Sequence, residues 1–290
     1  MGRRGSKDVA GCTALCREYA LKPAFPRPSI CYDRGVWNDI VDLRDFYETR
    51  LGQVARHLIR RRIRSIWPDL QGQSLLGLGY ATPYLRQFRD EAERVLAVMP
   101  AGQGVLPWPP EEPNAVALAD ETELPLPDVS FDRVLLVHGL ECGEHTRDML
   151  REVWRVMSGG GRLLLVVPNR RGIWARMDRT PFGQGHPYSP PQLSRLLRDN
   201  LFTPIQSTQS LFIPPIRSPT LLSTAPAWER IGSRWLQRFG GVVLMEAGKQ
   251  IYAGTAVRAK RKGRPVIVPF PQPAARSATR HTRSIIGPED

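Results

Sequence analysis

Three short segments carry the side chains that suit chemistry, and each lies at or just after the end of a predicted strand. The first is the glycine turn, residues 77–83, where a Gly-rich backbone can approach a ligand closely and free helix N–H groups can face it. The second is the acidic pair Asp120 and Glu121, whose carboxylates can accept hydrogen bonds. The third ends at His138, the side-chain type best suited to general-base catalysis near neutral pH. Each segment also has a purely structural interpretation. These are a tight turn without a ligand, a capping carboxylate and a histidine that is hydrogen-bonded in place.

A fourth segment, residues 168–189, mixes arginines, glycines and aromatic residues after another predicted strand. Guanidinium groups and aromatic rings suit an anionic or planar acceptor. The residues predicted to bind such a substrate are Arg170, Arg171, Trp174, Arg176 and Tyr188. The alternative is a loop that folds over the sheet and is only structural.

The elements that must position these segments alternate along the chain. Short apolar runs predict strands at 74–78, 94–99, 115–119, 133–138, 162–167, 204–213 and 241–252. Apolar residues at three- and four-residue spacings predict helices at 51–67, 144–157, 191–200 and 227–239, and a further helix start at Thr82 and Pro83. The glycines at 159–161 are expected to end the second of these helices. Strands that alternate with helices predict a mostly parallel sheet whose ligands bind at the carboxyl ends of the strands.

Charge is concentrated at the two ends of the chain. The net charge is +13, of which residues 1–37 contribute +4 and residues 258–290 contribute +6, so the middle carries only +3. Such tails are usually solvated, and the arginines of helix 51–67 are typical of the polar side of an amphipathic helix. Nucleic-acid binding is therefore an unfavoured hypothesis, in which the tails would make the contact.

The domain limits follow from composition. Residues 1–37 and 258–290 are rich in proline or basic residues and are predicted to be a poorly ordered extension and a disordered tail, which leaves one domain at 38–257. No apolar run is long enough for a membrane span and no signal peptide begins the chain, so we expect a cytoplasmic protein. Cys12 and Cys16 match no common zinc spacing, and no metal site is predicted.

Two motifs make the pattern specific. Residues 124–132 read LPLPDVSFD and lead into the strand at 133–138, and residues 152–161 read EVWRVMSGGG and lead into the strand at 162–167. In their order and spacing from about 75 to 168, these segments resemble the class I S-adenosylmethionine-dependent methyltransferases, in particular the branch of ubiquinone and menaquinone C-methyltransferases. The resemblance implies a Rossmann-like α/β fold with a mostly parallel seven-stranded sheet and helices on both faces.

The same resemblance implies S-adenosylmethionine as cofactor. It places Asp120 and Glu121 at the adenine, Met99 at the ribose, and His138 and Gly139 near the methyl group. The cofactor-binding glycine turn of the family would correspond to Gly77, Gly79, Tyr80 and Ala81.

The sequence also departs from the family's pattern. Gly77 stands where the family has an acidic residue, and Ala81 and Pro83 replace two of its three glycines. Met99 stands where the family has the ribose-binding carboxylate, and a thioether is a poor substitute for it. The loss of one charge-assisted hydrogen bond costs about 1.5–3 kcal/mol.

Two hypotheses about function follow. The chain is predicted to be a methyltransferase that transfers a methyl group to a small or medium-sized acceptor, with His138 as a candidate base and with catalysis mainly by alignment of donor and acceptor. The alternative is a catalytically degenerate methyltransferase fold that serves as a binding or scaffold protein.

Overall fold

The computed structural model describes residues 38–110 and 113–251 of the 290-residue chain. The predicted extension at 1–37 and the predicted tail at 258–290 lie outside these residues, as do Cys12, Cys16 and Cys31. The proposed domain limits therefore stay a prediction.

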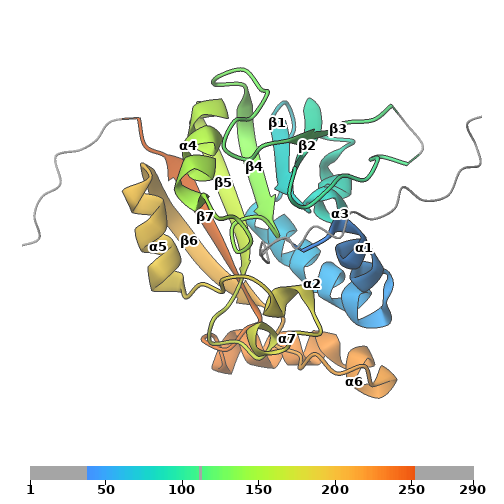
Figure 1. Ribbon diagram of the computed structural model, residues 1–290. Coiled ribbons are helices and arrows are strands. Elements are labelled where there is room, and N and C mark those ends of the chain that lie inside the picture. Colours follow the sequence, from blue (N-terminus) through green and yellow to red (C-terminus); the bar gives the residue numbers. More distant parts are fainter. Residues whose placement is uncertain (1–37, 111–112, 252–290) are drawn as a thin grey trace, which may run out of the picture. The chain divides into compact units, whose positions relative to one another are not determined.

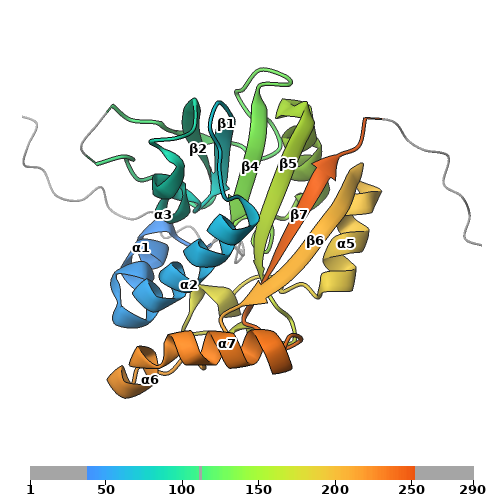
Figure 2. The same ribbon diagram turned by 180° about the vertical axis from the view of Figure 1, so that it is seen from behind.

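The core of the fold is a seven-stranded sheet in the order β3-β2-β1-β4-β5-β7-β6 (Figures 1 and 2). All neighbouring pairs are parallel except those that β7 makes with β5 and β6. The strands are β1 (Ser74–Gly79), β2 (Arg94–Pro100), β3 (Val116–Ala119), β4 (Phe131–Val137), β5 (Met157–Pro168), β6 (Phe202–Ser210) and β7 (Val242–Lys249). The prediction of a mostly parallel, Rossmann-like sheet is confirmed.

Helices cover both faces of this sheet, each over its own apolar cluster. One cluster includes residues of α1 (Ile40–Glu48), α2 (Arg50–Ile66), α3 (Thr82–Leu85), α6 (Pro219–Ser223) and α7 (Ala225–Trp235). The other includes residues of α4 (Thr146–Val156) and α5 (Pro190–Asp199). The 3₁₀ turns are η1 (Arg86–Phe88), η2 (Trp174–Arg176) and η3 (Pro181–Gly183).

Local sequence explains where the longer helices begin and which face they bury. The Thr49 side chain accepts a hydrogen bond from the Gly52 N–H and so caps α2. Ile59 and Ile63 are fully buried on its inner face, whereas the arginines between them face outward. Helix α5 begins with a capping box in which Ser189 pairs with Gln192.

Three predictions of local structure were incomplete. Helix α1 was missed, although Ile40, Leu43 and Tyr47 recur at helical spacing and are buried. Helix α6 was also missed. The glycines at 159–161 do not form a turn outside the sheet: α4 ends at Val156, and β5 starts directly at Met157 with a bulge opposite β4.

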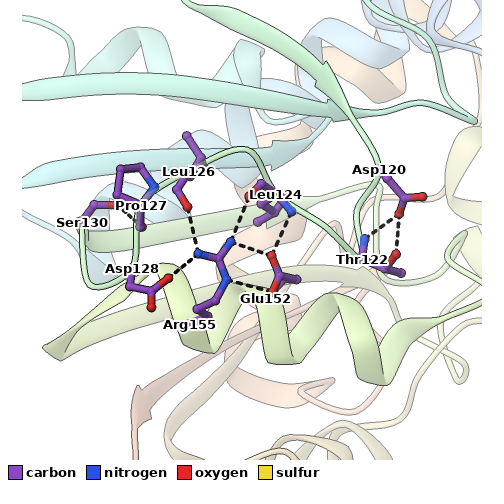
Figure 3. Close-up of polar contacts among 9 residues, drawn as sticks. All are labelled: Asp120, Thr122, Leu124, Leu126, Pro127, Asp128, Ser130, Glu152 and Arg155. Atoms are coloured by element: carbon purple, nitrogen blue, oxygen red, sulfur yellow. Dashed lines mark hydrogen bonds and ion pairs between the residues drawn. The ribbon is translucent and has the colours of Figure 1, made fainter.

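The two motifs that carried the resemblance are joined by Arg155 (Figure 3). Its guanidinium donates to the carboxylates of Glu152 and Asp128 and to the backbone carbonyls of Leu124 and Leu126. Glu152 in turn accepts from the Leu124 N–H at 2.9 Å. The guanidinium lowers the pKa of Glu152, and the two carboxylates raise the pKa of Arg155. We call this network the Arg155 lock, because it ties the segment before β4 to helix α4.

Candidate functional site

The carboxyl ends of β1 to β5 meet at one edge of the sheet, which we call the carboxyl edge. Gly79 ends β1 there with φ +75°, a conformation that favours glycine. A Cβ at this position would lie 2.3 Å from the Val137 carbonyl oxygen, to which the next residue, Tyr80, donates its N–H at 2.8 Å. The glycine turn is therefore packed directly against the end of β4.

His138 follows β4 and is the centre of this edge. Its φ of +51° is uncommon for a residue with a side chain, and such strained backbone concentrates at functional sites. Its backbone carbonyl accepts from Gln103 Nε2 at 2.9 Å, and its ring is 1% exposed. The structure thus holds this imidazole in a single enclosed orientation.

Four buried side chains form a hydrogen-bonded chain through His138. Tyr47 Oη lies 2.8 Å from Tyr84 Oη and 2.8 Å from His138 Nε2. On the other side of the ring, Nδ1 lies 3.2 Å from Glu141 Oε1. With an ionised Glu141, the His138 ring donates from Nδ1, and Nε2 accepts the Tyr47 hydroxyl proton. The second carboxylate oxygen of Glu141 is buried without a hydrogen-bond partner.

Burial controls the ionisation of the tyrosines at this edge. Desolvation raises the pKa of Tyr47 and of Tyr84 well above the ordinary value, and it raises the pKa of Tyr80 to about 12. These hydroxyls therefore stay protonated at neutral pH and can donate hydrogen bonds.

Helix α1 covers the carboxyl edge. Tyr47 stacks on Tyr80, with ring centroids 5.6 Å apart, and contacts the His138 ring edge-on. At the other end of the helix, the Ile40 N–H donates to the Gln103 carbonyl at 2.9 Å. Residues 77–82 of the glycine turn, the end of β2 and residues 138–143 are all buried in this arrangement.

Two predicted cofactor contacts lack the chemistry that the family uses. Gly77 offers no carboxylate, and a Cβ there would lie 2.6 Å from the Leu85 side chain. Met99 is fully buried in the apolar cluster beneath α1 and α2. Neither position supplies an acceptor for ribose hydroxyls.

The end of β3 does supply carboxylates. Asp120 is exposed, and its Oδ1 atom accepts hydrogen bonds from the Thr122 N–H at 2.8 Å and the Thr122 hydroxyl at 2.6 Å. These bonds lower the pKa of Asp120, so its carboxylate is ionised (Figure 3). Partial burial raises the pKa of the neighbouring Glu121. A carboxylate pair of this kind suits the amino group of an adenine.

The predicted acceptor residues are not gathered in one place. The indole of Trp174 is buried, and its N–H donates to the Ile213 carbonyl at 2.8 Å. Both observations give this side chain a structural role in the domain's interior. Arg170, Arg171 and Arg176 are exposed. Tyr188 packs against the apolar cluster on the opposite face of the sheet, and burial raises its pKa.

Two cavities adjoin the carboxyl edge. One, of 540 Å³, lies between the start of α2, the 177–180 segment and the 215–217 segment, and its walls include Phe46, Arg179 and Arg217. The Phe182 ring, 4.9 Å from the His138 ring and 6.1 Å from the Phe46 ring, packs between these two side chains. The other cavity, of 330 Å³, lies beside the glycine turn and is lined by the arginines of α2 and η1.

Sequence reasoning missed Tyr47, Tyr84, Gln103 and Glu141. Local signals existed for two of them: Tyr47 continues the helical spacing that starts at Ile40, and Glu141 follows His138 by three residues. Gln103 lies in a predicted loop and Tyr84 in a predicted helix, and only the tertiary structure brings them to the carboxyl edge.

Within residues 38–110 and 113–251, no group of three or more His, Cys, Asp or Glu side chains is arranged to hold a metal ion. Across the same described part of the chain, no helix is both long and apolar enough to cross a membrane.

Comparison with known proteins relates this geometry to a family. Residues 76–165 match the family described as "Methyltransferase domain". The demethylmenaquinone methyltransferase of Streptomyces avermitilis is 25% identical over 221 residues, which are 73% of this chain and 92% of that protein. The ubiquinone/menaquinone biosynthesis C-methyltransferase of Ectopseudomonas mendocina is 43% identical over 54 residues, which are only 19% of this chain and 21% of that relative.

A solved structure shares the fold. The S-adenosylmethionine-dependent methyltransferase of Thermotoga maritima, described as a possible histamine N-methyltransferase, superposes with a TM-score of 0.51 at 16% identity. The match covers 73% of this chain and 96% of the Thermotoga chain. At this identity the likeness concerns the fold alone.

Proposed function

We propose that this chain transfers a methyl group from S-adenosylmethionine to a small or medium-sized acceptor, because residues 76–165 match the family described as "Methyltransferase domain" and the sheet is mostly parallel. The observation that carries the proposal is the match of the domain together with a strained, hydrogen-bonded His138 at the carboxyl end of β4. S-adenosylmethionine, when bound, supplies an electrophilic methyl group.

The chain's own residues would hold the donor unevenly. Asp120 and Glu121 would accept from the adenine amino group, and the backbone at Gly79 and Gly139 would face the methionine end. Gly77, Tyr80 and Ala81 belong to the same turn, whereas Met99 would contact the ribose only through apolar atoms. Helix α1 must withdraw from the carboxyl edge to admit the donor, since Tyr47 and Ile40 contact this edge.

His138 is proposed as the general base. Its Nε2 atom accepts the Tyr47 hydroxyl proton in the closed arrangement, and this lone pair becomes available to an acceptor proton when Tyr47 moves away. Glu141 would fix the tautomer and stabilise the imidazolium that forms, as a buried carboxylate does for a catalytic histidine.

The acceptor is proposed to enter through the 540 Å³ cavity next to Phe46. The Phe46 ring and the Arg179 and Arg217 side chains in its walls favour a planar acceptor with an anionic group. The names of the two aligned relatives suggest a precursor of a quinone. The acceptor contacts predicted from sequence remain Arg170, Arg171, Arg176, Trp174 and Tyr188. Of these, the exposed arginines are better placed to contact an acceptor than the buried Trp174.

Titration of the protein with S-adenosylmethionine and S-adenosylhomocysteine by calorimetry tests the proposal. We expect saturable binding, which Asp120→Ala weakens about tenfold through the loss of a hydrogen bond to a charged group. Glu144→Ala, which removes an exposed carboxylate two residues before α4, is the matched control and should bind as the wild type does.

A second candidate function rests on the packed carboxyl edge. Met99, Gly77 and the covering helix α1 favour a methyltransferase fold that binds a partner without catalysis. The absence of any heat of binding at millimolar S-adenosylmethionine would support this candidate and refute the first one.

A further inference from the structure

The outward side of helix α7 carries an apolar stripe that the domain leaves exposed. Trp228, Ile231 and Trp235 follow one another at three- and four-residue spacings, so they lie on one side of the helix. Their exposed fractions are 36%, 56% and 76%, respectively. Phe239, shortly after the helix, is also exposed. Large side chains at this exposure are costly in water and mark an interaction surface when they are contiguous.

The side of α7 that bears Glu229 and Gly232 is anchored to the rest of the domain. Glu229 Oε1 accepts from the Ser210 hydroxyl at 2.8 Å and from the Leu211 N–H at 2.6 Å. Gly232 allows the helix to approach closely, since a Cβ there would lie 2.2 Å from the Phe212 ring. The anchored side fixes which residues face outward.

The charge around the stripe has one sign. Helix α7 and the segment after it, residues 225–241, contain three arginines, at 230, 234 and 238, and a single acidic residue, Glu229. The Glu229 side chain is turned toward β6, so it does not balance the arginines on the outer surface. Aromatic residues beside arginines on one helix are the composition of helices that lie in the headgroup region of an anionic bilayer.

The position of α7 relates this surface to the candidate site. Val242, which starts β7 soon after the helix, pairs with Pro168 at the carboxyl end of β5 and with Ser210 at the carboxyl end of β6. Both views show α7 at the end of the sheet where these strands finish, the end that α1 also covers (Figures 1 and 2).

We infer that the Trp228–Ile231–Trp235 stripe and its arginines dock this protein on an anionic lipid surface, with the carboxyl edge held near the bilayer. The inference stands on the surface of α7 and does not require methyl transfer. Tryptophan rings occupy the interfacial region, and the arginines contact lipid phosphates. A neutral protein partner would leave the arginines without counter-charges, which is why a phosphate-bearing surface is the better occupant.

Flotation of the full-length protein with vesicles tests this inference. Vesicles of phosphatidylcholine with phosphatidylglycerol should carry the protein, and vesicles of phosphatidylcholine alone should carry at least about tenfold less. Trp228→Ser with Trp235→Ser should reduce binding by at least about tenfold. The matched control, Leu118→Ser with Ile205→Ser, alters two similarly exposed apolar residues on β3 and β6 and should leave binding unchanged.

A second pair of variants tests the charge. Arg230→Gln with Arg234→Gln should weaken binding about fivefold for each arginine, whereas Arg195→Gln with Arg198→Gln on the exposed side of α5 should have little effect. Thermal melts confirm that each variant is folded. The inference would be overturned if the protein did not bind vesicles or if it bound both lipid compositions equally. It would also be overturned if the tryptophan variant bound vesicles as the wild type does and had lost self-association instead.

Discussion

The Arg155 lock and the His138 cluster are both hydrogen-bonded networks, but they differ in how they relate to the family. The lock is built from residues that match the family's motifs, and each of its groups is satisfied locally, between the 124–128 segment and α4. The His138 cluster contains no residue of these motifs, and it draws its members from α1, α3 and the segment that follows β4.

The difference shows that resemblance at the level of motifs concerns the scaffold more than the site. Arg155 and Glu152 hold a loop, and no reacting atom is required to explain them. At the carboxyl edge, Gly77 and Met99 lack the carboxylates expected in a methyl-donor site. Tyr47 and Glu141 belong to a buried hydrogen-bonded chain there that no sequence motif predicted.

The largest effect is expected at the glycine turn. Gly79→Ala places a methyl group 2.3 Å from the Val137 carbonyl in a backbone conformation that disfavours alanine, so we expect the free energy of unfolding to fall by about 3 kcal/mol. Gly160→Ala is the control, because nothing lies within 4 Å of its Cβ, and it should be nearly neutral. Urea unfolding measures both; a neutral Gly79→Ala would mean that the turn is loosely packed.

Removal of the lock should cost somewhat less. Arg155→Leu leaves two backbone carbonyls without the guanidinium that donates to them and leaves Glu152 with the Leu124 N–H but without its cationic partner, and we expect a loss of about 2–3 kcal/mol in the free energy of unfolding. Arg151→Leu alters an exposed arginine on the same helix whose partner, Asp148, is also exposed, and it should change stability by less than about 0.5 kcal/mol. Equal effects of the two substitutions would contradict the structural role of the lock.

Tyr47→Phe should have a smaller effect on stability. It removes the hydroxyl that joins Tyr84 to His138, and the expected loss is about 1–2 kcal/mol by urea unfolding. Tyr84→Phe removes only one of the two hydrogen bonds and should cost less. A double-mutant cycle with both substitutions measures their coupling, and additive effects would contradict a connected chain.

The smallest effect is confined to alkaline pH. Burial raises the pKa of Tyr80 to about 12, above the value of about 10 expected for the unfolded chain. The contribution of the protonated Tyr80 hydroxyl to the free energy of unfolding is therefore complete below pH of about 10. It is lost as the pH rises toward about 12. Unfolding free energy measured across this range should fall less steeply in Tyr80→Phe than in the wild type, and identical slopes would count against the burial of this hydroxyl.

The sequence by itself determined the seven strands, the helices α2, α4, α5 and α7, and the class of sheet, because these depend on local periodicity and on turn residues. It also placed the glycine turn, Asp120 and His138 at the carboxyl ends of strands, which is where the structure has them. Helix α1 was not predicted because it is short. Its place over the carboxyl edge depends on contacts with Tyr80, Gln103 and His138, which are distant from it in the sequence.

Only the tertiary structure decided which residues surround His138 and which predicted contacts are accessible. Burial separates Trp174, which packs inside, from Arg170 and Arg171, which face solvent, although the sequence presents all three in one loop. A side chain's environment depends on non-local packing, and the periodicity of its own segment does not contain that information.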